Sequence, residues 1–159
     1  MPNKYLTELD REYATCERTK AVLRIHCGDQ SPHIISDMLN LKPSHVVEVG
    51  VPGRTSSHGL APIGRVNLWL LDSEEHVNSR DLRHHLNWLL DQVEPATSGI
   101  LKLRQGGLVM DISCVWWSKT GDGGPALWPS QMRRIAALDL ELSIAPSFYG
   151  DDSEPDSAM

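Results

Sequence analysis

Apolar and polar residues alternate in five short stretches of the chain, a pattern typical of β-strands with one buried face. In the first stretch, Leu23, Ile25 and Cys27 fall on one face. The expected strands are Ala21–Cys27, His45–Val49, Arg65–Leu71, Met110–Ser118 and Leu140–Ala145. Because each strand is apolar mainly on one face, we expect a sheet that helices cover on one side.

Apolar residues recur at the helical period in the stretches between these strands. The clearest stripe consists of Leu82, Leu86, Leu89, Leu90 and Val93. Ser31 before Pro32 is a typical helix start, and Asn40 favours a left-handed helix end. We expect helices over Pro32–Leu39, Leu82–Val93, Ala96–Gln105 and Pro129–Leu138, with Pro95 interrupting the long helical stretch.

Two segments repeat the order strand, loop, helix, strand: Ala21–Val49 and Met110–Ala145. Each loop carries a Gly-Asp pair, which places Asp29 and Asp122 at equivalent positions. If the segments are structural repeats, the two aspartates point toward one cleft. The full order, β-α-β-β-α-β-α-β, predicts an α+β fold, ferredoxin-like or a related sandwich, with one sheet and helices mainly on one face.

Charge is distributed unevenly along the 159 residues. Residues 1–134 hold 15 bases and 15 acids, whereas residues 135–159 hold six acids and no base, which gives the net charge of -6. We therefore expect one α+β domain over residues 20–146, a polar arm over 1–19 that is a frayed end or a docking arm, and a disordered acidic tail over 147–159. Without a basic patch, nucleic acid is not an expected partner.

The sequence shows neither a membrane-spanning segment nor a secretory signal. No uninterrupted apolar run reaches roughly 18 residues, so no membrane span is expected. The polar segment Met1–Lys20 has no apolar core and is not a secretory signal, which favours the cytoplasm. The three cysteines, Cys16, Cys27 and Cys114, form no C-x-x-C pair and are expected to be reduced thiols.

Catalytic and cofactor motifs fit the sequence poorly. The loop Gly121–Ala126 matches G-x-G-x-x-[GA], but Leu127 and Trp128 separate its glycines from the helix start that a pyrophosphate would need. The seven histidines lack the spacings of metal ligands. No nucleophile elbow is present, and Asp111 is expected to face solvent from its strand. We expect no catalytic residue, no metal and no cofactor.

Tryptophans are the most distinctive side chains of the central region. Trp116 continues the apolar face of its strand and is expected in the core, whereas Trp117 falls on the opposite face. Trp117 and Trp69 are candidates for the open side of the sheet, and Trp128 lies in the loop before the last helix. Exposed aromatic residues mark interaction surfaces, unless the N-terminal arm or the long loop covers them.

An ordered series of short motifs runs through most of the chain. It comprises the Gly28-Asp29 loop, the Ser31-Pro32 helix start, the Leu39–Ser44 segment, a glycine-rich loop, the strand centred on Trp69, the Ile112–Trp116 strand and the Ala136–Leu140 helix end. This series resembles the bacterial domain-of-unknown-function 4279 family over about Lys20 to Ala145. The resemblance implies a small bacterial α+β domain without an assigned activity. The chain departs from the family pattern at Arg65–Asn67, where small polar residues are expected.

Two hypotheses about function follow from these patterns. The first is a non-catalytic interaction module whose partner is another protein, for example a toxin that it neutralises as an immunity protein, or a second copy that forms a homodimer on the Trp117 face. The alternative is an enzyme or small-ligand receptor that uses Asp29 and Asp122 in the two Gly-Asp loops. For both aspartates, ordinary turn chemistry is the competing explanation.

Overall fold

The computed structural model describes residues 6–53 and 62–150 of the chain. Helices and strands follow one another in the predicted order. They are β1 (Cys16–His26), α1 (Pro32–Leu39), β2 (His45–Val47), β3 (Leu68–Asp72), α2 (Leu82–Val93), the 3-10 turn η1 (Glu94–Ala96), α3 (Thr97–Gln105), β4 (Val109–Ser118), α4 (Pro129–Ala137) and β5 (Glu141–Ser147).

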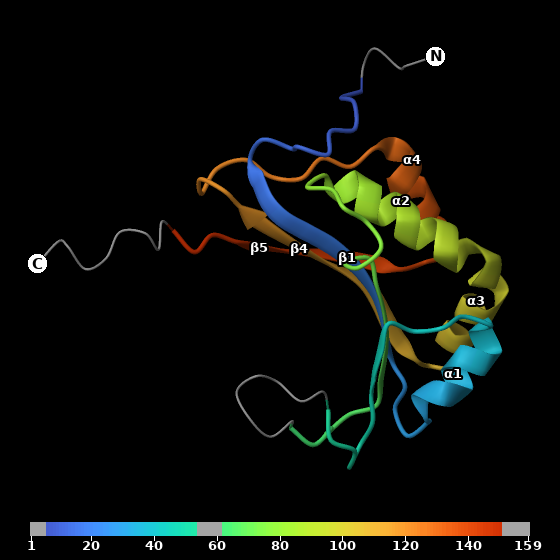
Figure 1. Cartoon of the computed structure of the whole chain (residues 1–159). Coiled ribbons are helices and arrows are strands. Elements are labelled where there is room, and N and C mark those ends of the chain that lie inside the picture. Colours follow the sequence, from blue (N-terminus) through green and yellow to red (C-terminus); the bar gives the residue numbers. More distant parts are fainter. Residues whose placement is uncertain (1–5, 54–61, 151–159) are drawn as a thin grey trace, which may run out of the picture.

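The strands form one mixed five-stranded sheet in the order β2-β3-β1-β4-β5. The central strand β1 is antiparallel to both β3 and β4, whereas β5 runs parallel to β4 at one edge. The helices lie on one side of this sheet (Figure 1). The fold is therefore α+β with helices on one face, as the alternating strands predicted. No helix in the described ranges is long and apolar enough to cross a membrane.

The core lies between the sheet and its helices, and alternation along the strands determines which residues enter it. Along β1, Leu23 and Ile25 are fully buried, and Leu86 and Leu89 of α2 belong to the same cluster. Trp69 is also fully buried, and its indole Nε1–H donates to Ser36 Oγ of α1 at 2.9 Å. The expectation that Trp69 lies on the open side is therefore wrong. Trp116 is in the core as predicted.

The helix boundaries follow local chemistry that the sequence displays. Ser31 caps α1 by accepting a hydrogen bond from the backbone N–H of His33. Asn40, after α1, and Asp139, after α4, both adopt the left-handed conformation, with φ of 52° and 54°. The two predicted repeats therefore end their helices in the same way. Pro95 lies in η1, which joins α2 to α3 at the expected interruption.

Strand boundaries differ most from the predictions where charged residues occupy strand positions. β1 begins at Cys16 rather than Ala21, because the charged Arg18 and Lys20 pair with β4 residues within the ladder. β2 and β3 are shorter than predicted, and isolated bridges such as Val49↔Gly64 continue their pairing. Part of the expected long loop, residues 54–61, lies outside the described residues, as do residues 1–5 and 151–159.

Candidate functional site

The side of the sheet opposite the helices, which we call the open face, carries no described helix (Figure 1). Paired residues on adjacent strands point to the same side, so its side chains form rows across the strands. The open face comprises His45, Val47, Leu68, Leu70, Asp72, Arg18, Lys20, Val22, Arg24, His26, Val109, Asp111, Ser113, Val115, Trp117, Glu141, Ser143, Ala145 and Ser147.

Ion pairs occupy the middle of the open face. Arg24 on β1 binds Asp111 on β4 in a bidentate contact, with Nε–Oδ1 and Nη2–Oδ2 distances of 2.8 and 2.6 Å. This hydrogen bonding raises the pKa of Arg24. Lys20 Nζ lies 3.0 Å from Asp72 Oδ2 and also pairs with Glu74. Asp111 faces the open side as predicted, but it is bound by a neighbouring strand.

Aromatic residues gather at one end of the open face, around Trp117. The ring of Tyr149 meets that of Trp117 edge-on, with centroids 5.3 Å apart, and the Arg18 guanidinium lies 4.9 Å from the Trp117 ring centroid. A Cβ atom added at Gly121 would lie 3.2 Å from the Phe148 ring, so this ring lies beside the loop after β4. Tyr149 and Phe148 remain 66% and 51% exposed, and we call Trp117, Phe148 and Tyr149 the aromatic end.

Aliphatic residues form the opposite end of the open face. Val47 on β2 pairs with Leu68 on β3, and Leu68 pairs with His26, which in turn pairs with Val109. Val109 is 67% exposed. We call the set Val47, Leu68 and Val109 the apolar end. The open face thus has apolar surface at both ends and paired charges between them.

The two Gly-Asp loops do not meet. Asp29 lies in the loop after β1, which ends at His26, and Asp122 lies in the loop after β4, which ends at Ser118. Because β1 and β4 are antiparallel, with Cys16 opposite Ser118 and His26 opposite Val109, the loops lie at opposite ends of the sheet. The prediction of a shared cleft is therefore wrong. Both aspartates are exposed.

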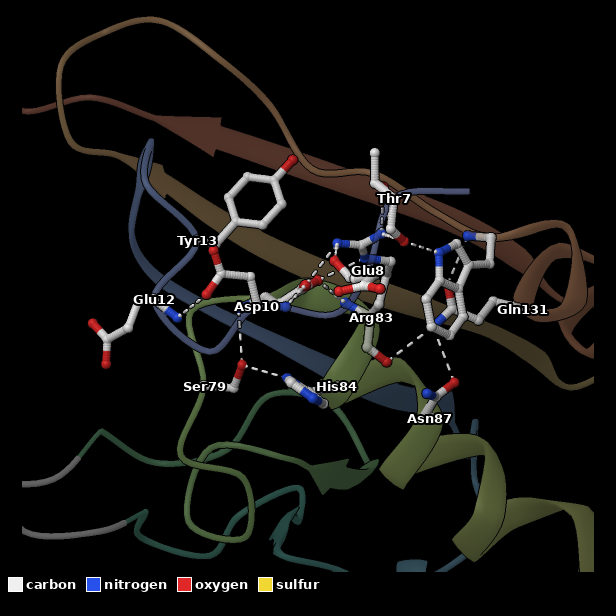
Figure 2. Close-up of polar contacts among 12 residues, drawn as sticks. Thr7, Glu8, Asp10, Glu12, Tyr13, Ser79, Arg83, His84, Asn87 and Gln131 are labelled. Atoms are coloured by element: carbon white, nitrogen blue, oxygen red, sulfur yellow. Dashed lines mark hydrogen bonds and ion pairs between the residues drawn. The ribbon is translucent and has the colours of Figure 1, made fainter. Parts of the chain in front are cut away.

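Asp81 and Arg83 form a buried ion pair at the start of α2. Figure 2 shows Arg83 among the polar residues that surround it, which include Thr7 and Glu8. Arg83 Nε and Nη2 donate to the two carboxylate oxygens of Asp81 at 2.9 and 2.7 Å. The remaining donors reach Thr7 O, Thr7 Oγ1 and Glu8 O. All five guanidinium N–H groups are therefore used, which leaves none for a ligand.

Both oxygens of the Asp81 carboxylate also accept hydrogen bonds within the protein. The carboxylate caps α2 by accepting from the backbone N–H of Arg83 at 3.0 Å, and it also accepts from the backbone N–H of Asp10 at 2.9 Å. Burial alone would raise the pKa of Asp81, but the hydrogen bonds from Arg83 and Asp10 outweigh it, so the pKa is lowered. The pair is thus a charged, saturated anchor for the N-terminal segment, a structural role.

Trp128 belongs to this anchor rather than to an exposed site. Its indole Nε1–H donates to Thr7 O at 2.8 Å, and the Arg83 guanidinium lies 5.3 Å from its ring centroid. Tyr13 Oη donates to Gly124 O at 2.7 Å. Residues 7–13 are therefore bound to the body of the protein. This part of the arm is therefore not a frayed end, and it does not cover the open face.

Gln131, on α4, is fully buried and contacts the residues of the anchor (Figure 2). Its Oε1 accepts from the backbone N–H of Trp128, and its Nε2 donates to Arg83 O and Asn87 Oδ1. Sequence reasoning missed Arg83 and Gln131. Both are polar residues at helical positions, where solvent exposure is the usual expectation.

Buried histidine and cysteine side chains also have structural explanations. His85 Nε2 lies 2.8 Å from Ser79 O, and its Nδ1 lies 2.7 Å from Ser73 Oγ. Burial lowers the pKa of His85. Burial also raises the pKa of Cys16 to about 11 and that of Cys114 to about 12, so these thiols stay protonated near neutrality. No cluster of three metal-ligating side chains occurs within residues 6–53 and 62–150.

The model of one protein family, Domain of unknown function (DUF4279), matches residues 17–149. The chain belongs to the DUF4279 family. The match confirms the resemblance drawn from the motifs. The DUF4279 span begins within β1 and ends on Tyr149, so it contains the open face and the aromatic end but not the anchored segment 7–13. Comparisons with curated proteins and with solved structures found no match.

Proposed function

We propose that this protein is a non-catalytic interaction module whose open face binds another protein. The observation that carries the proposal is the pattern of that face, with exposed apolar and aromatic groups at its two ends. Tyr149 and Val109 are each about two-thirds exposed, at 66% and 67%. Aromatic residues are enriched in protein interfaces.

The order of charge and apolar surface favours a partner of a different sequence that binds reversibly. Permanent interfaces between identical subunits are most apolar at their centre. On this open face the central rows hold the Arg24–Asp111 and Lys20–Asp72 pairs, interspersed with the apolar residues Val22 and Leu70. Such fixed charges give orientation and selectivity to a partner with complementary charges. A toxin neutralised by an immunity protein is one partner of this class.

Catalysis is the weaker hypothesis for the described residues. The acidic side chains that motivated it, Asp29 and Asp122, lie at opposite ends of the sheet. The buried charged groups, Asp81 and Arg83, are saturated by hydrogen bonds. A protein-binding surface, unlike an active site, requires neither acidic side chains that meet in one cleft nor charged groups without partners. The interaction module therefore accounts for more of the molecule.

Site-specific photo-crosslinking in the source cell tests the proposal. A photoreactive amino acid would replace Val109 or Tyr149 on the open-face side. Matched controls would replace Ile34 on α1 and Met132 on α4, which are 48% and 51% exposed on the helical side. We expect both open-face positions to yield one adduct with the same protein, identified by mass spectrometry, and the helical positions to yield none.

Three results would contradict the proposal. Adducts formed only at Ile34 or Met132 would show that the partner binds the helical side instead of the open face. The absence of any open-face adduct would argue against a protein partner on this surface. An adduct of this chain with itself would replace the proposed partner with a second copy.

We also infer that the fold is an extended ferredoxin-like arrangement. What supports this is the order β2-β3-β1-β4, with α1 linking β1 to β2 and the α2–α3 stretch linking β3 to β4. Helix α4 and β5 would then be an addition at the β4 edge. Superposition of an experimental structure on ferredoxin-like domains tests this, and a mismatch in the β1-α1-β2 path would reject it.

A further inference from the structure

A cavity of about 370 Å³ opens at the edge of the sheet, away from the two ends of the open face. Its walls come from the segment before β2, the segment after β3 and one side of α2, and they include Lys42, His45, Glu75, His76, Trp88 and Gln92. Two hydrogen bonds fix the segment before β2 to β3: Ser44 N–H donates to Leu70 O at 2.7 Å, and Asp72 N–H donates to Ser44 Oγ at 2.9 Å. The cavity is therefore built on a rigid corner of the fold.

Several side chains of this cavity have no partner among the described residues, in contrast to the saturated Asp81–Arg83 anchor. Lys42, Glu75 and Gln92 make no side-chain hydrogen bond or ion pair with any residue that the structure describes. The same holds for the imidazoles of His45 and His76. Asp72 and Glu74, which also line the cavity, are paired with Lys20. One free cation and one free anion thus remain among the lining side chains, together with neutral donors and acceptors.

A flat aromatic surface accompanies these polar groups. The ring of His76 stacks on that of Trp88 with centroids 4.5 Å apart and planes 9° apart. His76 comes from the segment after β3 and Trp88 from α2. Concave sites with an apolar surface and a few convergent polar groups are typical of small-ligand binding.

We propose that this cavity binds a free amino acid with a planar or apolar side chain. In that assignment Lys42 pairs with the ligand carboxylate, Glu75 pairs with its ammonium group, and the His76–Trp88 pair contacts its side chain. The lining offers one free cation, Lys42, and one free anion, Glu75, which suits a ligand with one charge of each sign better than a phosphorylated ligand. Two lining residues, His45 and Asp72, also belong to the open face, but the cavity lies at the sheet edge and the proposal does not depend on the proposed protein partner.

Titration with defined probes tests the site on the full-length protein. L-Tryptophan, L-phenylalanine and L-leucine would be compared with tryptamine, indole-3-propionate, AMP and inorganic phosphate by calorimetry. The Trp88 indole N–H resonance, assigned from Trp88→Phe, would report binding at the cavity. We expect at least one amino acid to bind and to shift this resonance. Tryptamine and indole-3-propionate, which each lack one charged group, should bind at least about tenfold more weakly than L-tryptophan.

Substitutions in the cavity provide the second arm of the test. Glu75→Gln and Lys42→Gln should each weaken amino-acid binding by about tenfold or more. The matched controls Asp37→Asn on α1 and Lys102→Gln on α3 remove exposed charges elsewhere and should leave binding unchanged. All four changes are at surface positions, so folding is expected to be retained and is checked by circular dichroism.

The inference is overturned if no amino acid binds at concentrations up to about 10 mM. It is equally overturned if binding leaves the Trp88 resonance in place, or if AMP or phosphate binds instead. Binding of tryptamine as tightly as L-tryptophan would reject the role of Lys42. Each of these results leaves the photo-crosslinking test of the open face unaffected, so failure of one proposal is distinguishable from failure of the other.

Discussion

Individual polar side chains fall into two groups, those saturated by the fold and those left free. Arg83 is 1% exposed and uses all five of its N–H donors within the protein. A buried charge is tolerated when it is paired and fully hydrogen-bonded. Loss of one partner leaves the other charge buried and unpaired, so the two members of such a pair depend on each other.

Replacing Arg83 by methionine should destabilise the protein strongly. Arg83→Met keeps much of the side-chain volume but leaves the Asp81 carboxylate buried without its cation, a change that costs about 3–5 kcal/mol. The matched control Arg134→Met removes a surface ion pair with Asp91 and Glu94 and should cost under about 1 kcal/mol. Urea unfolding of both variants measures the difference. Equal losses would show that the buried pair is no more important than the exposed one.

His85 should make the protein less stable in mild acid. Its folded-state pKa is lowered from 6.5 by burial, so the unfolded chain takes up a proton first. Stability is then complete above about pH 6.5 and falls as the pH drops below it, by up to about 1.4 kcal/mol per pH unit, until the folded-state pKa is reached. The charged groups that act on His85, namely Asp72, Asp81 and His84, do not reverse this direction.

The variant His85→Asn separates this effect from general acid sensitivity. Asparagine retains a polar group near Ser73 but does not titrate. Unfolding free energies would be measured from pH 7.5 to 5.5 for both proteins, and the slope should be smaller for the variant. His84 also has a pKa lowered by burial, so some slope should remain. Identical slopes would assign the acid sensitivity to other groups.

Strand alternation predicted single residues well where one face is simply apolar. It assigned Trp116 to the core and Trp117 and Asp111 to the other side, as observed. It did not reveal that Trp69 faces the helices, because both neighbours of that residue are leucines. Arg83 was missed for a different reason, since its partners at Thr7 and Glu8 lie more than 70 residues away in the chain.

Among the elements, strand order is the feature that local patterns predict least. Each strand and helix was recognisable from its own residues, but pairing joins segments far apart in sequence. The two strand-helix-strand units illustrate this. In the first, β3 lies between β1 and β2, whereas in the second β4 and β5 are direct neighbours. The two units therefore share the left-handed residue that ends their helices, Asn40 or Asp139, but they do not share the arrangement of their strands in the sheet.

Pro146 should limit pairing between the exposed edge strand β5 and strands of other chains. A free edge offers backbone N–H groups to other strands, and proline removes one of them. Pro146→Val should therefore increase oligomer formation, measured by sedimentation velocity. The control Ala145→Val adds a β-branched side chain at the adjacent position without adding an N–H group. Equal association of the two variants would attribute the effect to side-chain propensity instead.

At the scale of the whole molecule, the two faces of the sheet have separate roles. The helical face holds the core and the saturated anchor, and it accounts for the stability of the fold. The open face holds charges that are paired within it, so it stays close to neutral while presenting apolar surface at both ends. If the open face binds a partner as we propose, substitutions there should change binding with little effect on folding.

A charge exchange on the open face tests that separation. The double variant Arg24→Asp with Asp111→Arg keeps an ion pair between β1 and β4 but reverses its direction across the sheet. Because the Arg24 and Asp111 side chains are 39% and 19% exposed, the unfolding free energy should change by no more than about 1 kcal/mol. If a partner protein recognises the Arg24–Asp111 ion pair, the photo-crosslinked adduct from position Tyr149 should be lost in the variant. An adduct of unchanged yield would mean that the partner contacts the apolar or aromatic end without reading the ion pair between them.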